Sequence, residues 1–131
     1  MEEKERKELQ EAWLESAAED LKTAKALFNL KRFDGCLFFC HLAIEKTLKA
    51  VFLKMNNTYP PPIHKLVRLA NLSKIKLDKE NEKDLAEITT FNVEARYDIL
   101  KERLHKKATN AFTAKYLKAT QELMKKFKQL L

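Results

Sequence analysis

The sequence contains one glycine, three prolines and two cysteines among its 131 residues. It has no Asn-Gly or Gly-Gly pair, and such pairs supply the positive φ angles of tight β-hairpin turns, so a β-sheet is disfavoured. The good helix formers Ala, Leu, Glu and Lys are abundant instead. We therefore predict an all-α fold, with one domain over residues 1–131 built as an up-and-down bundle of four to five helices.

Disulfides, metal sites and membrane spans also lack support in the sequence. Cys36 and Cys40 are four residues apart on a predicted helix, which does not suit a disulfide, and no Cys/His group has metal-site spacing. We expect two small buried side chains, no metal and no cofactor. No apolar run approaches the ~20 residues that span a membrane, and the N-terminus lacks the apolar stretch of a signal peptide. The sequence thus predicts a cytoplasmic protein without a membrane contact.

Basic residues outnumber acidic ones by 26 to 19, which gives a net charge of +7 and an isoelectric point near 9.4. This excess suits an anionic partner such as RNA or a nucleotide, but a lysine-rich soluble surface would have the same composition. The excess is concentrated late in the chain, where residues 101–128 hold nine Lys or Arg and two Glu. Binding of an anion is expected in that segment.

Two long helices are predicted in the first half of the chain. From about Lys7 to Leu30, apolar residues recur with the period of a helix that has one buried face. A second helix, from Phe33 to Met55, is apolar on nearly all sides, so we expect a central helix or one that also forms a subunit interface. Its polar exceptions lie within roughly 80° of one another around the helix axis: Asp34, His41, Glu45 and Lys49.

The second half is predicted to hold shorter helices. Pro60–Pro62 end the second helix, and a short helix is expected over His64–Leu72. Asp78 is a suitable N-cap for a third long helix that begins near Lys79. The weakly periodic segment Tyr97–Asn110 is expected to be a loop with partial helix. A final helix is expected from Thr113, with Thr113 as its cap and with these residues inward: Tyr116, Leu117, Thr120, Met124 and Phe127.

Several short strings resemble those of one protein family, the HEPN (higher eukaryote and prokaryote nucleotide-binding) domains. Ala43–Ala50 is similar to the family's Ala-x-Glu-Lys-x-x-Lys-Ala string on its second helix, and Pro62–Leu66 resembles its Thr-His-x-Leu string. Ala95–Tyr97 resembles its Ala-Arg-Tyr signature, and the opening helix around Trp13 is similar too. The resemblance extends over most of the chain.

This resemblance implies a homodimeric helical bundle that binds nucleotide or RNA. It also implies a minimal nucleotidyltransferase as partner, in a toxin–antitoxin-like pair. Other HEPN proteins are metal-independent endoribonucleases, in which an Arg is followed four to six residues later by a His. Here eight residues separate Arg96 from His105, and Arg103 precedes His105 by only two positions. The resemblance therefore favours a binding module over an enzyme.

Candidate site residues each have a functional and a structural interpretation. Arg96 would bind phosphate or anchor Glu45, and Tyr97 would stack on a base or pack beside Arg96. Glu45 and Lys49 would contact a ligand or form an internal ion pair.

The histidines and the late basic residues complete the candidate set. His41 and His105 are candidate proton-transfer groups. The alternative for His41 is a hydrogen-bonded residue of the core, and the alternative for His105 is an exposed residue without a chemical role. His64 would be a loop anchor or a ligand. The remaining candidates for contacts with nucleotide or RNA are basic: Arg103, Lys106 and Lys107.

Three functions remain open on this basis. The first is a HEPN-type binding and regulatory module that does not cleave RNA. The second is a ribonuclease that uses Arg96 with His105 or His41. The third is an interaction protein whose charge serves only solubility. No glycine-rich phosphate loop is present, so the sequence does not indicate a P-loop or Rossmann site.

Overall fold

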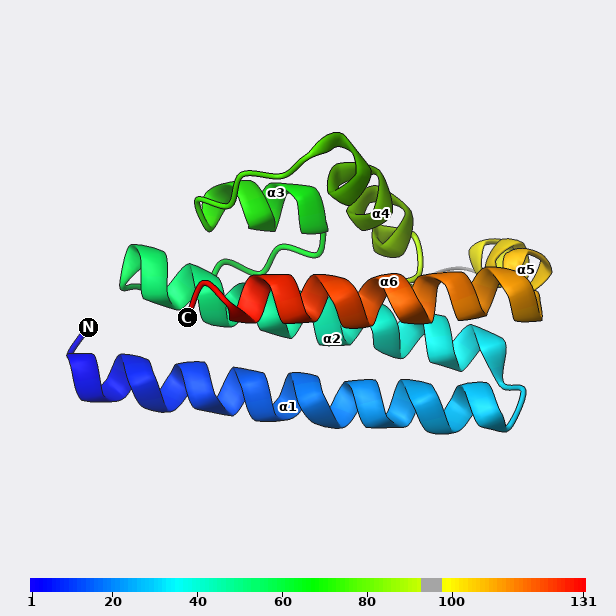
Figure 1. The fold of residues 1–131 in the computed structure, drawn as a ribbon, viewed down its shortest axis with the longest axis horizontal. Helices are drawn as coiled ribbons and strands as arrows, with labels where there is room; N and C mark the ends of the chain where they lie inside the picture. The colour runs from blue at the N-terminus through cyan, green and yellow to red at the C-terminus, as the bar shows by residue number, and fades with distance from the viewer. Residues whose placement is uncertain (93–97) are drawn as a thin grey trace.

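The chain forms six helices and no strand in the computed structural model, which describes residues 1–92 and 98–131 (Figure 1). The all-α class is confirmed, with one helix more than the upper number predicted. The helices are α1 (Glu3–Asn29), α2 (Phe33–Asn56), α3 (Leu66–Leu72), α4 (Lys79–Thr89), α5 (Asp98–Lys107) and α6 (Asn110–Lys128). None of these helices has the length and apolar character needed to cross a membrane.

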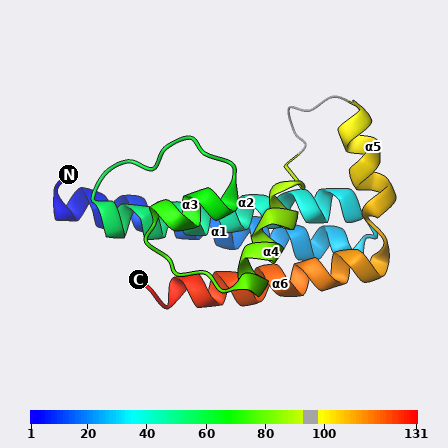
Figure 2. The same cartoon turned by 90° about the horizontal axis from the view of Figure 1, so that it is seen from above.

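The three longest helices, α1, α2 and α6, form the body of the bundle (Figures 1 and 2). α2 runs antiparallel to α1, to which a short turn joins it. α6 runs in the same direction as α2, because α3, α4 and α5 lie between them in sequence and carry the chain back along the bundle. α3 and α4 cover one side, and α5 lies at the end where α1 turns into α2.

α2 is the central helix, as its apolar composition predicted. It contacts each of the other five described helices, and 13 of its 24 residues are buried. Leu37, Ile44 and Leu48 of α2 are fully buried in the main core, together with Phe91 and Phe127 from later segments. Burial of a side chain of this kind contributes about 1.5–3 kcal/mol, so the bundle depends on the apolar sides of α2.

Glycine is almost absent, so other residues take the left-handed backbone positions that follow helices. Lys31, Asn57 and Lys74 have φ angles of 60°, 50° and 61°. Asn57 is the C-cap of α2, and its N–H donates to the Leu53 carbonyl oxygen. A lysine in this conformation costs roughly 1 kcal/mol relative to glycine.

Gly35, the only glycine, lies where α1 and α2 approach closely. A Cβ atom there would come within 3.0 Å of the Leu27 Cδ1 atom on α1. Cys36 and Cys40, on the same helix, are buried and free, as expected. This part of the interface therefore relies on small side chains.

Three predictions about the second half need correction or adjustment. The segment Tyr97–Asn110, expected to be a loop with partial helix, contains the ten-residue helix α5. The periodicity of α5 is weak because Leu104 is the one buried residue among those of α5 whose side chains are described. The last helix begins at Asn110 with Thr109 as its cap, whose Oγ1 accepts the Phe112 N–H at 3.2 Å. Thr113, the predicted cap, is instead buried inside α6.

The other two helix starts are close to expectation. Asp78 caps α4 as predicted, and its Oδ1 accepts the Asn81 N–H at 2.7 Å. α4 is shorter than expected, with 11 residues. α3 begins at Leu66, two residues after the predicted start, and this leaves His64 in the preceding connection.

Candidate functional site

His41 and Lys49 of α2 lie close to the Glu45 carboxylate, together with His64 from the connection before α3. Glu45 Oε1 accepts a hydrogen bond from His64 Nδ1 at 2.7 Å, and Glu45 Oε2 accepts one from Lys49 Nζ at 3.2 Å. The Glu45 side chain is almost completely buried, whereas the His64 side chain is 59% exposed. Each carboxylate oxygen thus has a cationic or polar donor, which offsets the cost of burying the charge.

The surroundings of Glu45 keep it ionised. Burial favours the neutral acid, but the hydrogen bond from His64 and the charge of Lys49 outweigh this effect and hold the pKa of Glu45 below its usual value. The predicted internal ion pair between Glu45 and Lys49 is therefore present. Its connection to His64 was not predicted, because a 19-residue separation that contains three prolines gives no periodic signal.

Lys49 also connects α2 to α1. Its Nζ atom lies 4.9 Å from the centre of the Trp13 ring, a cation–π geometry. Because Lys49 contacts both the Trp13 ring and the Glu45 carboxylate, its ammonium group is held inside the bundle. This accounts for a lysine whose side chain is almost buried on the central helix.

His41 occupies the core, one turn before Glu45. Its side chain is fully buried, and its Nε2–H donates to the His64 carbonyl oxygen at 3.2 Å. Burial lowers the pKa of His41, and this effect exceeds the opposing influence of the His64 carbonyl and the Glu45 carboxylate. A neutral imidazole without solvent access fits the hydrogen-bonded core role rather than proton transfer.

A second ion pair joins α1 and α2 and was not predicted. Lys46 Nζ lies 2.7 Å from Asp20 Oδ2 and donates to Ser16 Oγ at 2.7 Å. Asp20 is buried although it lies on α1 among charged residues. It lies three residues after Ala17 and four residues before Ala24, both buried, and this helical spacing was a signal that sequence reasoning could have used.

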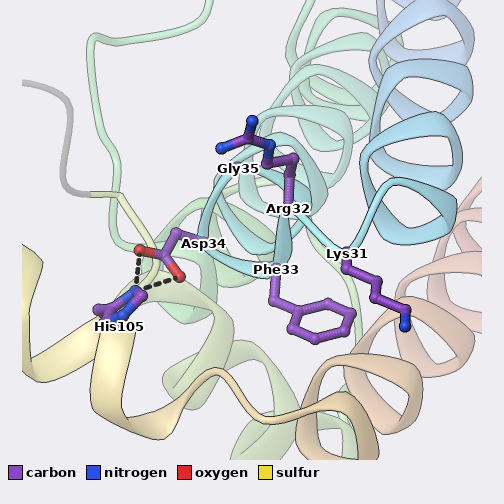
Figure 3. Close-up of a pocket in the computed structure, with 6 residues that line it drawn as sticks. All are labelled: Lys31, Arg32, Phe33, Asp34, Gly35 and His105. Atoms are coloured by element: carbon purple, nitrogen blue, oxygen red, sulfur yellow. Dashed lines mark hydrogen bonds and ion pairs between the residues drawn. The ribbon is translucent and has the colours of Figure 1, made fainter.

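The candidates on α5 lie apart in sequence and in position from the Glu45 group. Arg103 and Lys106 are exposed to solvent. Lys107 pairs with Glu87 of α4, with 2.6 Å between Nζ and Oε1. His105 is exposed, as its alternative interpretation predicted, and its Nδ1 lies 2.9 Å from Asp34 Oδ2 in the first turn of α2 (Figure 3).

The predicted residues thus form two groups, one inside the bundle and one on its surface. Glu45, Lys49 and His41 belong to the internal group with His64. In it the Glu45 carboxylate accepts from His64 and Lys49, and the His41 ring donates to the His64 carbonyl oxygen. The basic residues of α5 belong to the surface group. Arg96 and Tyr97 lie outside the described residues, so the predicted contact between Arg96 and Glu45 stays a prediction. Among residues 1–92 and 98–131 no cluster could hold a metal ion.

These features define a class: a small helical bundle whose central helix carries an internal acid–base network and whose surface is basic. The model of the HEPN domain family matches residues 10–130, nearly the whole chain. The chain therefore belongs to the HEPN domain family. Comparison with curated proteins gives no significant match.

A solved structure shares the fold. The crystal structure of TT1696 from Thermus thermophilus matches with a TM-score of 0.78, and the match covers 93% of this chain and 98% of that one. The two sequences are 16% identical, so the likeness concerns the fold alone. The family supports a nucleotide- or RNA-related module at its most general level.

Proposed function

We propose that this chain is a nucleotide- or RNA-binding regulatory module that does not cleave its ligand. The observation that carries this proposal is the exposed basic face of α5, where Arg103 and Lys106 are accessible to solvent. Arginine and lysine at such positions supply the phosphate contacts of sequence-independent binding. The internal network supports a binding role over catalysis, because Glu45 and Lys49 already satisfy each other.

Titration of labelled RNA and of ATP into the purified protein tests this function. We expect binding of at least one ligand at modest salt, and an affinity that falls steeply as salt rises, because phosphate contacts release counterions. A flat curve for both ligands at low salt would instead favour an interaction protein whose charge serves only solubility.

The proposal includes a homodimer. Phe38 and Leu42, one turn apart on α2, stay partly exposed although α2 is the central helix. Ile99 on α5 is 63% exposed. A second copy of the chain would cover such apolar side chains. One chain has a mass of 15.4 kDa, and light scattering should give twice this value. The mass of a single chain at working concentration would contradict the homodimer.

The partner that the HEPN resemblance implies is a minimal nucleotidyltransferase, in a toxin–antitoxin-like system in the cytoplasm. The gene beside the one for this chain should then encode such an enzyme. Co-expression of both with an affinity tag on one should recover a complex of the two. Recovery of the tagged protein alone would count against the pairing.

A metal-independent endoribonuclease is the second candidate. The observation that favours it is the Asp34–His105 contact, in which a carboxylate orients an exposed imidazole by its Nδ1 atom. Such an imidazole has its Nε2 atom available for proton transfer, and Arg96 would steady the phosphate. RNA incubated with wild type, Arg96→Ala and His105→Ala decides between the two functions, because equal cleavage by all three would indicate a contaminating nuclease.

A further inference from the structure

The turn between α1 and α2 and the C-terminal half of α5 meet at one end of the bundle. Asp34 and His105, 71 positions apart in sequence, are in contact there, with both Asp34 oxygens within 3.2 Å of His105 Nδ1. Figure 3 shows this contact beside Lys31 and Arg32, two of the three residues between α1 and the start of α2. The contact joins α5 to the first turn of α2, which directly follows these two residues.

Basic side chains from both segments are exposed at this end. Lys31 and Arg32 are exposed on the turn, and Arg103 and Lys106 are exposed on α5. Among the described residues, none of these four cations has a carboxylate within ion-pair distance, whereas Lys107 is paired with Glu87. The end of the bundle thus presents more positive charge than α5 alone supplies.

The shape at this end suits a polymer better than a single phosphate group. A shallow pocket of about 250 Å³ lies at the turn and is lined by Lys31, Arg32, Phe33, Asp34, Gly35 and His105. Lys31 and Arg32 leave the turn in different directions and do not converge on one point (Figure 3). The Asp34 carboxylate in the pocket would repel an isolated phosphate placed beside His105. Diverging cations can instead contact separate phosphates of one strand.

We propose that Lys31 and Arg32 extend the basic face of α5 into a binding surface for the backbone of single-stranded RNA. This inference rests on the proposed function, since it assumes that the chain binds RNA, and it selects a polymer over a mononucleotide. The Asp34–His105 contact joins α5 to the start of α2, next to the turn, and the two cations of the turn contact phosphates. Contacts of this kind give affinity without sequence preference.

The test compares wild type with the double variant Lys31→Gln/Arg32→Gln. The matched control is Lys76→Gln/Lys79→Gln, which removes the same charge from exposed residues at the connection between α3 and α4. Fluorescence anisotropy with labelled single-stranded RNA is measured over a series of salt concentrations. Loss of two phosphate contacts should weaken binding roughly tenfold and make the slope of log K against log[salt] less negative by about 1.4. The control should stay within about twofold of wild type.

The outcomes separate this surface from the proposed function. If wild type binds no RNA, the RNA-binding function fails, and this surface fails with it. If wild type binds RNA but the turn variant matches it, or both double variants weaken equally, this surface is wrong while RNA binding stands. Excess ATP at constant ionic strength should not displace the RNA. Displacement by ATP would overturn the assignment to a polymer.

Discussion

The Glu45 carboxylate and the His64 imidazole lie 2.7 Å apart and join the middle of the central helix to the connection before α3. The same connection accepts a hydrogen bond from His41 through the His64 carbonyl oxygen. His64 therefore contacts α2 by its side chain and by its backbone. The chain from the end of α2 to the start of α3 is held at this point, although it contains three consecutive prolines.

Replacing His64 by alanine should lower the free energy of unfolding. Glu45 would keep its contact with Lys49 but lose the hydrogen bond that its carboxylate accepts from His64. We expect this loss to cost about 1–2 kcal/mol of stability. The cost is below the largest values for hydrogen bonds to charged groups because the His64 ring is largely exposed. Urea denaturation of wild type and His64→Ala measures the difference. His105→Ala is the control, since its ion pair with Asp34 is exposed on both sides and should contribute under about 1 kcal/mol. Equal losses in the two variants would contradict the structural role of His64.

Stability should decrease as the solution becomes mildly acidic, because His41 is buried. Its pKa in the folded protein lies below the ordinary 6.5 of the unfolded chain, so the unfolded state takes up more protons once the pH falls below about 6.5. Glu45 affects stability at lower pH than His41. Its depressed pKa gives stability that is complete above the ordinary 4.5 and is lost as the pH falls below it.

The variant His41→Gln isolates the first effect, since glutamine keeps a donor for the His64 carbonyl oxygen and does not titrate. Denaturation at several pH values between about 7.5 and 5.5 should show a smaller loss of stability for the variant than for wild type. Parallel profiles for the two proteins would show that His41 is not responsible.

The helices of the first half could be predicted closely because their apolar periodicity is strong. α2 begins at Phe33 as expected and ends one residue after the predicted Met55. Glu45 and Lys49 could be paired from sequence because they are one turn apart on one helix. Local spacing was sufficient for these features.

Other features depend on contacts between distant segments. The segment that contains α5 was expected to be a loop with partial helix, and the bounds of the helix could not be predicted. Its described side chains are largely exposed, so burial leaves little pattern in its sequence. The contacts of Glu45 with His64, of Lys46 with Asp20 and of His105 with Asp34 join residues 19, 26 and 71 positions apart (64 − 45, 46 − 20 and 105 − 34). No helical period relates such pairs, so only the tertiary structure brings them together.

Replacing Lys74 by glycine should stabilise the protein. Lys74 has a φ angle of 61°, a conformation that glycine adopts without the steric cost of a Cβ atom. The gain should be at most about 1 kcal/mol, reduced by loss of the exposed hydrogen bond from Lys74 Nζ to the Met55 carbonyl oxygen. Thermal denaturation measures the change. Lys83→Gly, an exposed position inside α4, is the control and should cost about 1 kcal/mol. A loss of stability in both variants would mean that the backbone at residue 74 does not carry this strain.

The ion pair between Lys46 and Asp20 should contribute measurably to the packing of α1 on α2. Its side chains are only 21% and 12% exposed, so water and salt screen it little. A double-mutant cycle with Lys46→Gln and Asp20→Asn should give a coupling energy of about 1–2 kcal/mol. The same cycle on Lys22 and Glu19, at 75% and 73% exposure on α1, should give about 0.5 kcal/mol or less. Raising the salt concentration should reduce the second coupling more than the first. If the two couplings were equal in size and in salt dependence, the Lys46–Asp20 pair would be a surface pair, and α1 would be held to α2 by its apolar face alone.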